Sequence, residues 1–326
     1  MTSLHPSSSI LGLDLSGTGA PRGFGNDSGS DAEAFIMGRL AGLATLADKG
    51  GVDLLTLDST FRVGGRRRDE WLDGALAAAR LGRHTSRLTV AAAVPLGSSD
   101  AAGVATAIGS VHKATDGRAA WQVDGGTAAR GVSAVTSRLT KSNAKVPAAQ
   151  VVVAVTGPLD LELAAARADI ARIRPASLSE AVELRSAIRQ AAQDWGRAAD
   201  DVRVIVDLKA VIGADEEGAV ARADLLAGFD PDAAQVLEFV GTATGLADLW
   251  QEWVDAGAAD GFTIVPTSVP TDVLAVVTEL APELQRRGLH GPVPATSAAS
   301  DSAGRQSARG TRRVPARSGR KVPVAA

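Results

Sequence analysis

The stretch 87–123 constrains the fold most, because it reads as a strand, a helix and a second strand joined by short connections. Its first part, 87–95, is an apolar run too continuous for a strand with one face in water, and is typical of a parallel strand buried on both faces. Residues 99–113 follow with apolar side chains at helical spacing, and Gly117 ends the helix before the strand 118–123. The stretch therefore predicts one right-handed βαβ unit.

The same alternation of strand and helix repeats along the chain. Eight apolar runs qualify as strands: 10–15, 52–57, 87–95, 118–123, 150–155, 169–173, 202–208 and 261–266. Eight strands alternating with helices predict a (β/α)8 TIM barrel. A doubly wound open sheet is the alternative, but no Gly-rich dinucleotide fingerprint follows the first strand.

Length and composition agree with a single barrel and exclude several site classes. A chain of 326 residues with 45% hydrophobic residues can bury a large core. The absence of Cys excludes disulfides and thiolate chemistry, and the four His are scattered, so no metal site is expected. No segment has the length and apolarity of a membrane span or a signal peptide, so the expectation is a cytoplasmic protein without a membrane partner.

Charge divides the chain into two expected parts. Residues 301–326 hold seven Lys and Arg and one acidic residue, which leaves the tail at +6 and, with 27 basic and 36 acidic residues, the rest at −9. The expected domains are a barrel over 1–291 and a basic, flexible tail over 292–326. The tail is interpreted as a solvated end, or as an arm that makes weak contacts with nucleic acid or another anionic surface.

In a (β/α)8 barrel the chemistry lies at the carboxyl ends of the strands. The residues that follow the predicted strands there are candidates for a site: Asp58 to Thr60, Ala93 to Leu96, Gln122 to Gly126, Thr156 to Asp160, Arg174, Asp207 to Lys209 and Pro266 to Ser268.

Three blocks carry a family resemblance over roughly residues 10–291. They are Gly51–Ser59, Arg87–Val123 and Gly241–Leu289, and the third is the most specific because the similarity persists through a helix, a strand and the next helix. In these blocks the chain resembles the bacterial luciferase-like flavin monooxygenases, in the branch of nitrilotriacetate and dibenzothiophene-sulfone monooxygenases.

The resemblance implies a flavin-dependent oxidoreductase or monooxygenase acting on a small organic substrate. Reduced flavin mononucleotide (FMN) would come from a separate reductase and bind at the barrel mouth, and the deazaflavin coenzyme is the less favoured alternative. The family also implies a homodimer. Such enzymes leave the chemistry to the cofactor, so no catalytic residue is assigned.

The family's cofactor-binding positions carry over to Asp58, Ala93, Asp124, Thr156 and Gly157. Asp58 matches the acidic residue beside the flavin ring, which is weighed against a simple cap of the next loop. Ala93 replaces a polar residue, and Asp124 begins the segment that replaces Val-Thr-Ser. Thr156 and Gly157 fall in the region that contacts the phosphate.

Several departures from the family pattern favour a second hypothesis. The helical insertion after the fourth strand is reduced to 125–147, the chain has no Tyr, and Pro158 and Asp160 oppose phosphate binding. The alternative is a degenerate luciferase-like barrel without flavin chemistry, acting as a partner or regulatory subunit.

Overall fold

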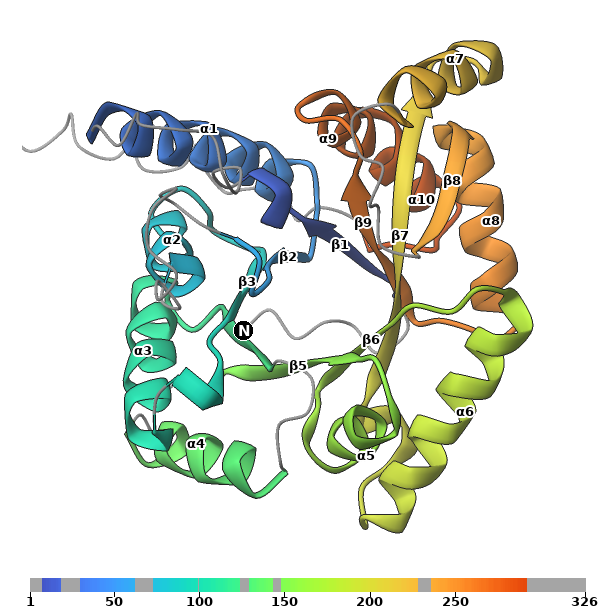
Figure 1. Cartoon of the computed structure of the whole chain (residues 1–326). Helices are drawn as coiled ribbons and strands as arrows, with labels where there is room; N and C mark the ends of the chain where they lie inside the picture. Colours follow the sequence, from blue (N-terminus) through green and yellow to red (C-terminus); the bar gives the residue numbers. More distant parts are fainter. Residues whose placement is uncertain are drawn as a thin grey trace, which may run out of the picture. The chain divides into compact units, whose positions relative to one another are not determined.

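Eight parallel strands close into a ring, as the sequence predicts (Figure 1). The computed structural model describes residues 8–18, 30–61, 73–98, 100–123, 129–142, 148–227 and 236–291. The ring strands, in order, are β1 (Ile10–Asp14), β2 (Leu54–Leu57), β3 (Thr89–Ala93), β4 (Ala119–Val123), β5 (Gln150–Val155), β6 (Ile170–Ile173), β7 (Arg203–Gly213) and β9 (Gly261–Pro266). Pairing of β6 with β7 and of β1 with β9 closes the ring, so the structure is a (β/α)8 TIM barrel.

A ninth strand, β8 (Leu237–Thr242), was not predicted from the sequence and lies outside the ring. β7 is 11 residues long and extends beyond β6, whose last pair with it is Ile173 with Val206. Beyond that point β8 pairs with β7, from Leu208–Leu237 to Gly213–Thr242. β8 therefore takes up the hydrogen bonds of β7 along the part of its edge that β6 does not reach.

The strands carry one core inside the ring and another outside it. Strand alternation points one set of side chains inward, where seven pack together near the amino ends: Ile10, Leu54, Ala91, Ala120, Val152, Ile170 and Ile205. The alternate residues, such as Leu11, Leu55 and Phe262, face the helices and are fully buried. Because both faces are apolar, the strands read as continuous hydrophobic runs.

Helices cover the outside of the ring (Figure 1). They are α1 (Ser30–Lys49), α2 (Asp73–Leu81), α3 (Ala101–Ala114), α4 (Ala129–Ser142), α5 (Pro158–Arg167), α6 (Leu178–Asp194), α7 (Glu216–Ala227), α8 (Ala243–Asp255), α9 (Thr271–Ala275) and α10 (Ala281–Arg286). A π-helical turn over Val276–Leu280 joins α9 to α10, so the three form one continuous helical segment after β9.

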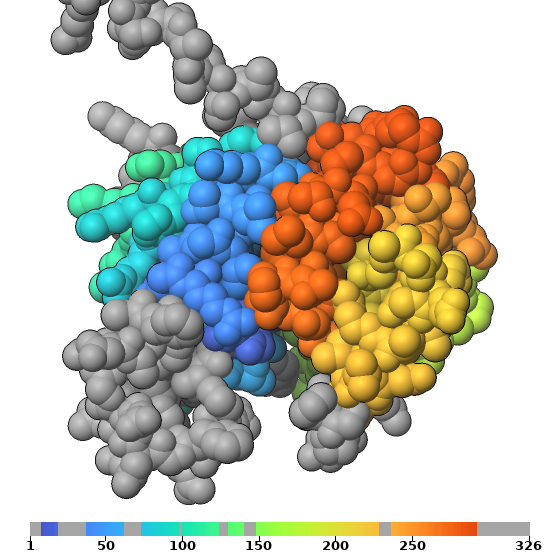
Figure 2. Space-filling model, turned by 90° about the horizontal axis from the view of Figure 1, so that it is seen from above, coloured from blue at the N-terminus to red at the C-terminus, as the bar shows by residue number. Residues whose placement is uncertain are grey.

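The connection between β4 and β5 contains α4, which packs against α3 and α5 in the outer layer. It is thus the ordinary helix of a βα unit. The ends of the barrel meet at the β1–β9 pairing, and in the view from above the blue surface of the first units borders the orange surface of the last (Figure 2).

Candidate functional site

A buried arginine crosses the inside of the barrel above the apolar layer. Arg172 lies two residues after Ile170 on β6, so it also points inward, and its side chain is 2% exposed. Its Nε donates to Asp207 Oδ1 at 2.7 Å, and its terminal nitrogens donate to Gln122 Oε1 at 3.0 Å and Asp14 Oδ2 at 2.8 Å. The guanidinium therefore ties β6 to β1, β4 and β7.

Asp14 is the other well-satisfied member of this network. Thr56 Oγ1 donates to Asp14 Oδ2 at 2.8 Å, and the Ser16 N–H donates to Oδ1 at 2.9 Å. Burial opposes ionisation of Asp14, but Arg172 and these hydrogen bonds outweigh it, so its pKa lies below the usual value. Burial likewise opposes the charge of Arg172, yet the two carboxylates raise its pKa. The layer is thus ionised and paired.

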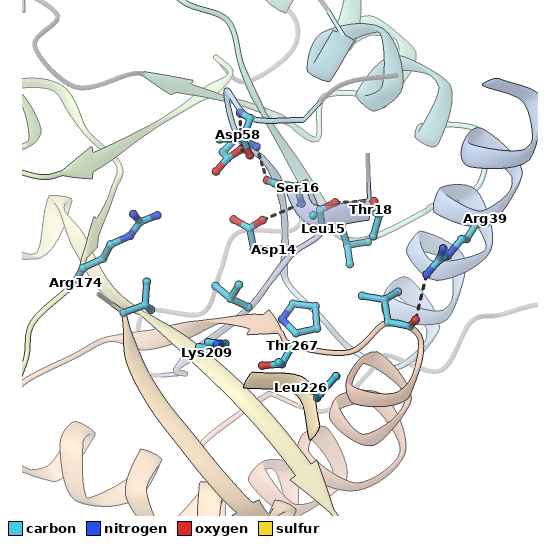
Figure 3. A pocket seen from close by; sticks show the side chains of 16 residues that line it. Asp14, Leu15, Ser16, Thr18, Arg39, Asp58, Arg174, Lys209, Leu226 and Thr267 are labelled. Carbon is cyan, nitrogen blue, oxygen red and sulfur yellow. Dashed lines mark hydrogen bonds between the residues drawn. The ribbon is translucent and has the colours of Figure 1, made fainter. Parts of the chain in front are cut away.

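A pocket of about 540 Å³ opens above this layer at the carboxyl ends of β1, β2, β6, β7 and β9 (Figure 3). Its apolar lining includes Leu15, Val265 and Val269. Its ionisable lining consists of Asp14, Asp58, Arg39, Arg174 and Lys209. Apolar walls with a few charged groups are the usual composition of a small-molecule site.

Among the predicted cofactor residues that the structure describes, Asp58 alone lies in the lining of this pocket. Its Oδ1 accepts from the Thr60 N–H at 2.7 Å and from Thr60 Oγ1 at 2.5 Å, while its own N–H donates to Ser16 Oγ at 2.7 Å. The carboxylate therefore caps the loop after β2, as the simpler interpretation expects, and it also faces the pocket.

Thr156 and Gly157 lie elsewhere, at the start of α5. Asp160 accepts from the Thr156 N–H at 3.1 Å and from Thr156 Oγ1 at 2.6 Å, and Pro158 occupies the first helical position. Gly157 retains an N–H at the amino end of the helix. A dianionic phosphate placed here would face the Asp160 carboxylate, and Thr156 has already given both of its donors to that carboxylate. The segment does not fit the predicted role.

Of the remaining two predicted residues, the structure describes only Ala93. Ala93 ends β3, is 3% exposed and is absent from the lining. Asp124 falls outside the described residues. Of the four predicted positions that the structure describes, only Asp58 therefore lines the mouth pocket.

Two residues of the network were missed by the sequence reasoning. Asp14 and Arg172 lie within predicted strands rather than after them. The available signal was a charged residue on the inward register of a strand, since Arg172 and Arg174 share a face with Ile170.

The residues that the structure describes include neither a metal-binding cluster nor a membrane-spanning helix. No group of three or more His, Asp or Glu side chains is placed to hold a metal ion. None of the described helices has the length and apolarity to span a bilayer.

Comparison with known sequences gives short local matches. No family model matches the chain. N-acetyl-S-(2-succino)cysteine monooxygenase of Bacillus subtilis is 49% identical over 51 residues, which is 16% of this chain and 12% of that protein. The nitrilotriacetate monooxygenase component A of Aminobacter aminovorans is 45% identical over 49 residues, 15% of this chain and 11% of the relative. The matched segments thus span only a small part of these relatives.

Comparison with solved structures extends over nearly the whole barrel. DmoA from Hyphomicrobium sulfonivorans superposes with a TM-score of 0.67 at 15% identity, over 87% of this chain and 89% of that one. Riboflavin lyase with modified FMN and riboflavin superposes with a TM-score of 0.66 at 16% identity, over 87% of this chain and 93% of that one. At these identities the similarity establishes the fold.

Proposed function

We propose that this chain, a luciferase-like barrel by its fold and by the segment it shares with monooxygenases, is a flavin-dependent oxidoreductase acting on a small organic substrate. The observation that carries the proposal is the mouth pocket, placed where (β/α)8 enzymes hold their ligands. We further propose monooxygenation with FMN, since the two matched relatives are monooxygenases and riboflavin lyase contains modified FMN.

The pocket fits a flavin ring in size and lining. Its volume of about 540 Å³ lies within the ~300–1,000 Å³ usual for cofactor and ligand sites. Leu15, Val265 and Val269 would contact the faces of the ring, and Asp58 would lie at its polar edge. The phosphate of FMN needs other residues, since Thr156 and Gly157 do not fit it.

A bound reduced flavin would supply the electrons for reducing oxygen or substrate. The protein's own part is to hold and orient the ligands. Arg172 fixes Asp14 and Asp207 beneath the pocket, and Arg174 supplies the second positive charge that balances the two carboxylates. Asp14 stays ionised because its pKa is lowered, so it serves as a hydrogen-bond acceptor rather than as a proton donor. The reduced flavin would come from a separate reductase.

Direct titration tests the proposal. The full chain is titrated with oxidised FMN, with reduced FMN under anaerobic conditions, and with the deazaflavin coenzyme, by fluorescence and calorimetry. The expected result is saturable binding of FMN tighter than about 100 μM, or roughly −5.5 kcal/mol. Saturable binding of the deazaflavin coenzyme alone would make it, rather than FMN, the cofactor. If none of the three binds saturably, the enzyme proposal is overturned.

A second candidate is a barrel without flavin chemistry that acts as a partner or regulatory subunit. The specific observation in its favour is the Asp160 carboxylate, which accepts both donors of Thr156 where the family places the cofactor phosphate. Failure of all three cofactors to bind would favour this candidate.

A further inference from the structure

Two cations, one directly after β6 and one on β7, face the mouth pocket. Arg174 follows β6 and its side chain is 38% exposed, and Lys209 of β7 is 19% exposed. Figure 3 shows both side chains at the pocket, with Arg39 on the far side. Neither cation belongs to the set of residues that the family resemblance predicts.

Arg174 is held by one nitrogen and leaves the others available. Its Nε donates to Asp207 Oδ2 at 2.9 Å, while the other oxygen of Asp207 accepts from Arg172 at 2.7 Å. Its two terminal nitrogens have no acceptor among the described residues. A guanidinium anchored through Nε and open at its terminal nitrogens suits an anion with two oxygens.

Lys209 is only loosely paired. Its Nζ lies 3.5 Å from Glu238 Oε1 on β8, and Glu238 is 49% exposed. A solvent-exposed ion pair at this distance contributes little to stability, so the Lys209 ammonium can turn toward a ligand. The inward register on β7, shared with Ile205 and Asp207, directs Lys209 to the pocket.

Thr267 adds an unused hydroxyl to the same pocket. Its Oγ1 is shielded from solvent and has no hydrogen-bond partner among the described residues. Thr267 follows β9, whose Val265 pairs with Lys209, and its N–H donates to the Ala210 carbonyl, so the residue lies beside the Lys209 segment of β7. A shielded hydroxyl without a partner is costly, and a ligand oxygen would satisfy it.

The carboxylates of the lining leave donors of these cations open. Asp14 is paired with Arg172, and the Asp58 carboxylate accepts two hydrogen bonds from Thr60. Arg39 donates to the Val269 carbonyl at 3.1 Å and adds a third cation to the lining. Asp207 engages Arg174 through Nε alone and Glu238 lies 3.5 Å from Lys209, so this side of the pocket offers open cationic donors although its formal charges are balanced by nearby carboxylates.

We propose that Arg174, Lys209 and Thr267 form an anion-binding subsite of the mouth pocket, which takes the phosphate or carboxylate group of the small molecule bound there. As a statement about cofactor or substrate it rests on the proposed function. Binding of a simple anion is independent of flavin and can be measured without it.

The first experiment titrates the full chain with inorganic phosphate and with succinate in the absence of flavin. We expect saturable binding that weakens at least tenfold in Arg174→Gln and in Lys209→Gln. Arg174→Lys, which keeps the charge but not the guanidinium, should lose less affinity than Arg174→Gln. Matched controls are Arg138→Gln and Lys113→Gln, exposed positions on α4 and α3, which should leave the affinity unchanged.

Two results would overturn the inference. One is the absence of saturation by either anion up to about 10 mM. The other is equal affinity in the subsite variants and in the control variants, all shown to be folded by circular dichroism. Either result concerns the anion alone, so it is distinct from a failure of flavin binding.

The second experiment identifies the source of the anion by comparing FMN with riboflavin, which lacks the phosphate. If the phosphate of FMN occupies the subsite, FMN binds at least tenfold tighter than riboflavin, and Arg174→Gln abolishes the difference. If the substrate's group occupies it, FMN and riboflavin bind equally and succinate still binds in the presence of FMN. Binding of anions without binding of either flavin would retain the subsite and overturn the flavin proposal.

Discussion

Arg172 and Asp14 are 158 positions apart in the chain and 2.8 Å apart in the barrel. Their strands, β6 and β1, are not neighbours, since β7 and β9 lie between them on one side of the ring. The ion pair therefore crosses the interior rather than following a strand pairing. It joins the first and second halves of the barrel directly beneath the mouth pocket.

Replacing Arg172 with Met should destabilise the protein severely. The substitution leaves the carboxylates of Asp14 and Asp207 buried, and Asp14 loses its only ion pair among the described residues. Removing one partner of a buried pair costs about 3–5 kcal/mol. Urea unfolding followed by circular dichroism measures the loss.

A triple variant tests whether the buried carboxylates cause the loss of stability. The triple variant Arg172→Met, Asp14→Asn, Asp207→Asn removes both carboxylates that lose Arg172, and should recover at least half of the lost stability. An Arg172→Met protein as stable as Arg138→Met, a surface change on α4, would show that the crossing pair is energetically unimportant.

The strands of the ring were predictable, but the network inside it was not. Continuous apolar runs such as 150–155 and 261–266 reveal a strand buried on both faces wherever it pairs. Arg172 gave a weaker signal, because its partners lie on β1, β4 and β7 and the sequence does not show which charges meet. Burial of a charge is decided by those distant partners.

Two other differences have local causes. β8 was missed because its residues are mostly half-buried and the eight apolar runs already complete a ring. Thr156 was predicted from a motif position, but Asp160, one helical turn on, accepts its donors. A motif gives the position of a hydroxyl and not its partner.

Gly261→Ala should disrupt the pairing of β1 with β9, which closes the ring. Gly261 begins β9 opposite Ile10 and has φ of +147°, a conformation that side chains disfavour. A Cβ there would overlap the Ile10 carbonyl oxygen, so β1 and β9 would have to separate. We expect a loss of about 3 kcal/mol or more, measured by urea unfolding. Gly97→Ala, with open space around its Cα, is the control and should change stability little.

Asp260 should make the protein sensitive to acid. Burial opposes its ionisation, but hydrogen bonds from Arg185 and the Val204 N–H, with the charge of Arg189, outweigh burial and lower its pKa from 3.8. A folded pKa below the unfolded one gives stability that is present above the unfolded value and is lost as pH falls through the folded value.

The measurement compares wild type with Asp260→Asn across pH. At neutral pH the variant should be less stable by about 1–3 kcal/mol, and the gap should narrow from about pH 4 downward. Asp255→Asn, an exposed neighbour at the end of α8, is the control. A gap that stays constant to about pH 2 would mean that the ionisation of Asp260 is not what stabilises this corner.

Thr156→Ala tests whether the start of α5 holds a phosphate. Both donors of Thr156 already serve Asp160, at 3.1 Å and 2.6 Å, so removing the hydroxyl should leave the ratio of FMN to riboflavin affinity within about twofold. The same change should cost about 1.5–3 kcal/mol of stability, since one hydrogen bond to a carboxylate is lost. Fluorescence titration with both flavins gives the ratio. A tenfold loss for FMN with riboflavin unaffected would place the phosphate at α5, and the cations of β6 and β7 would then have to serve the substrate.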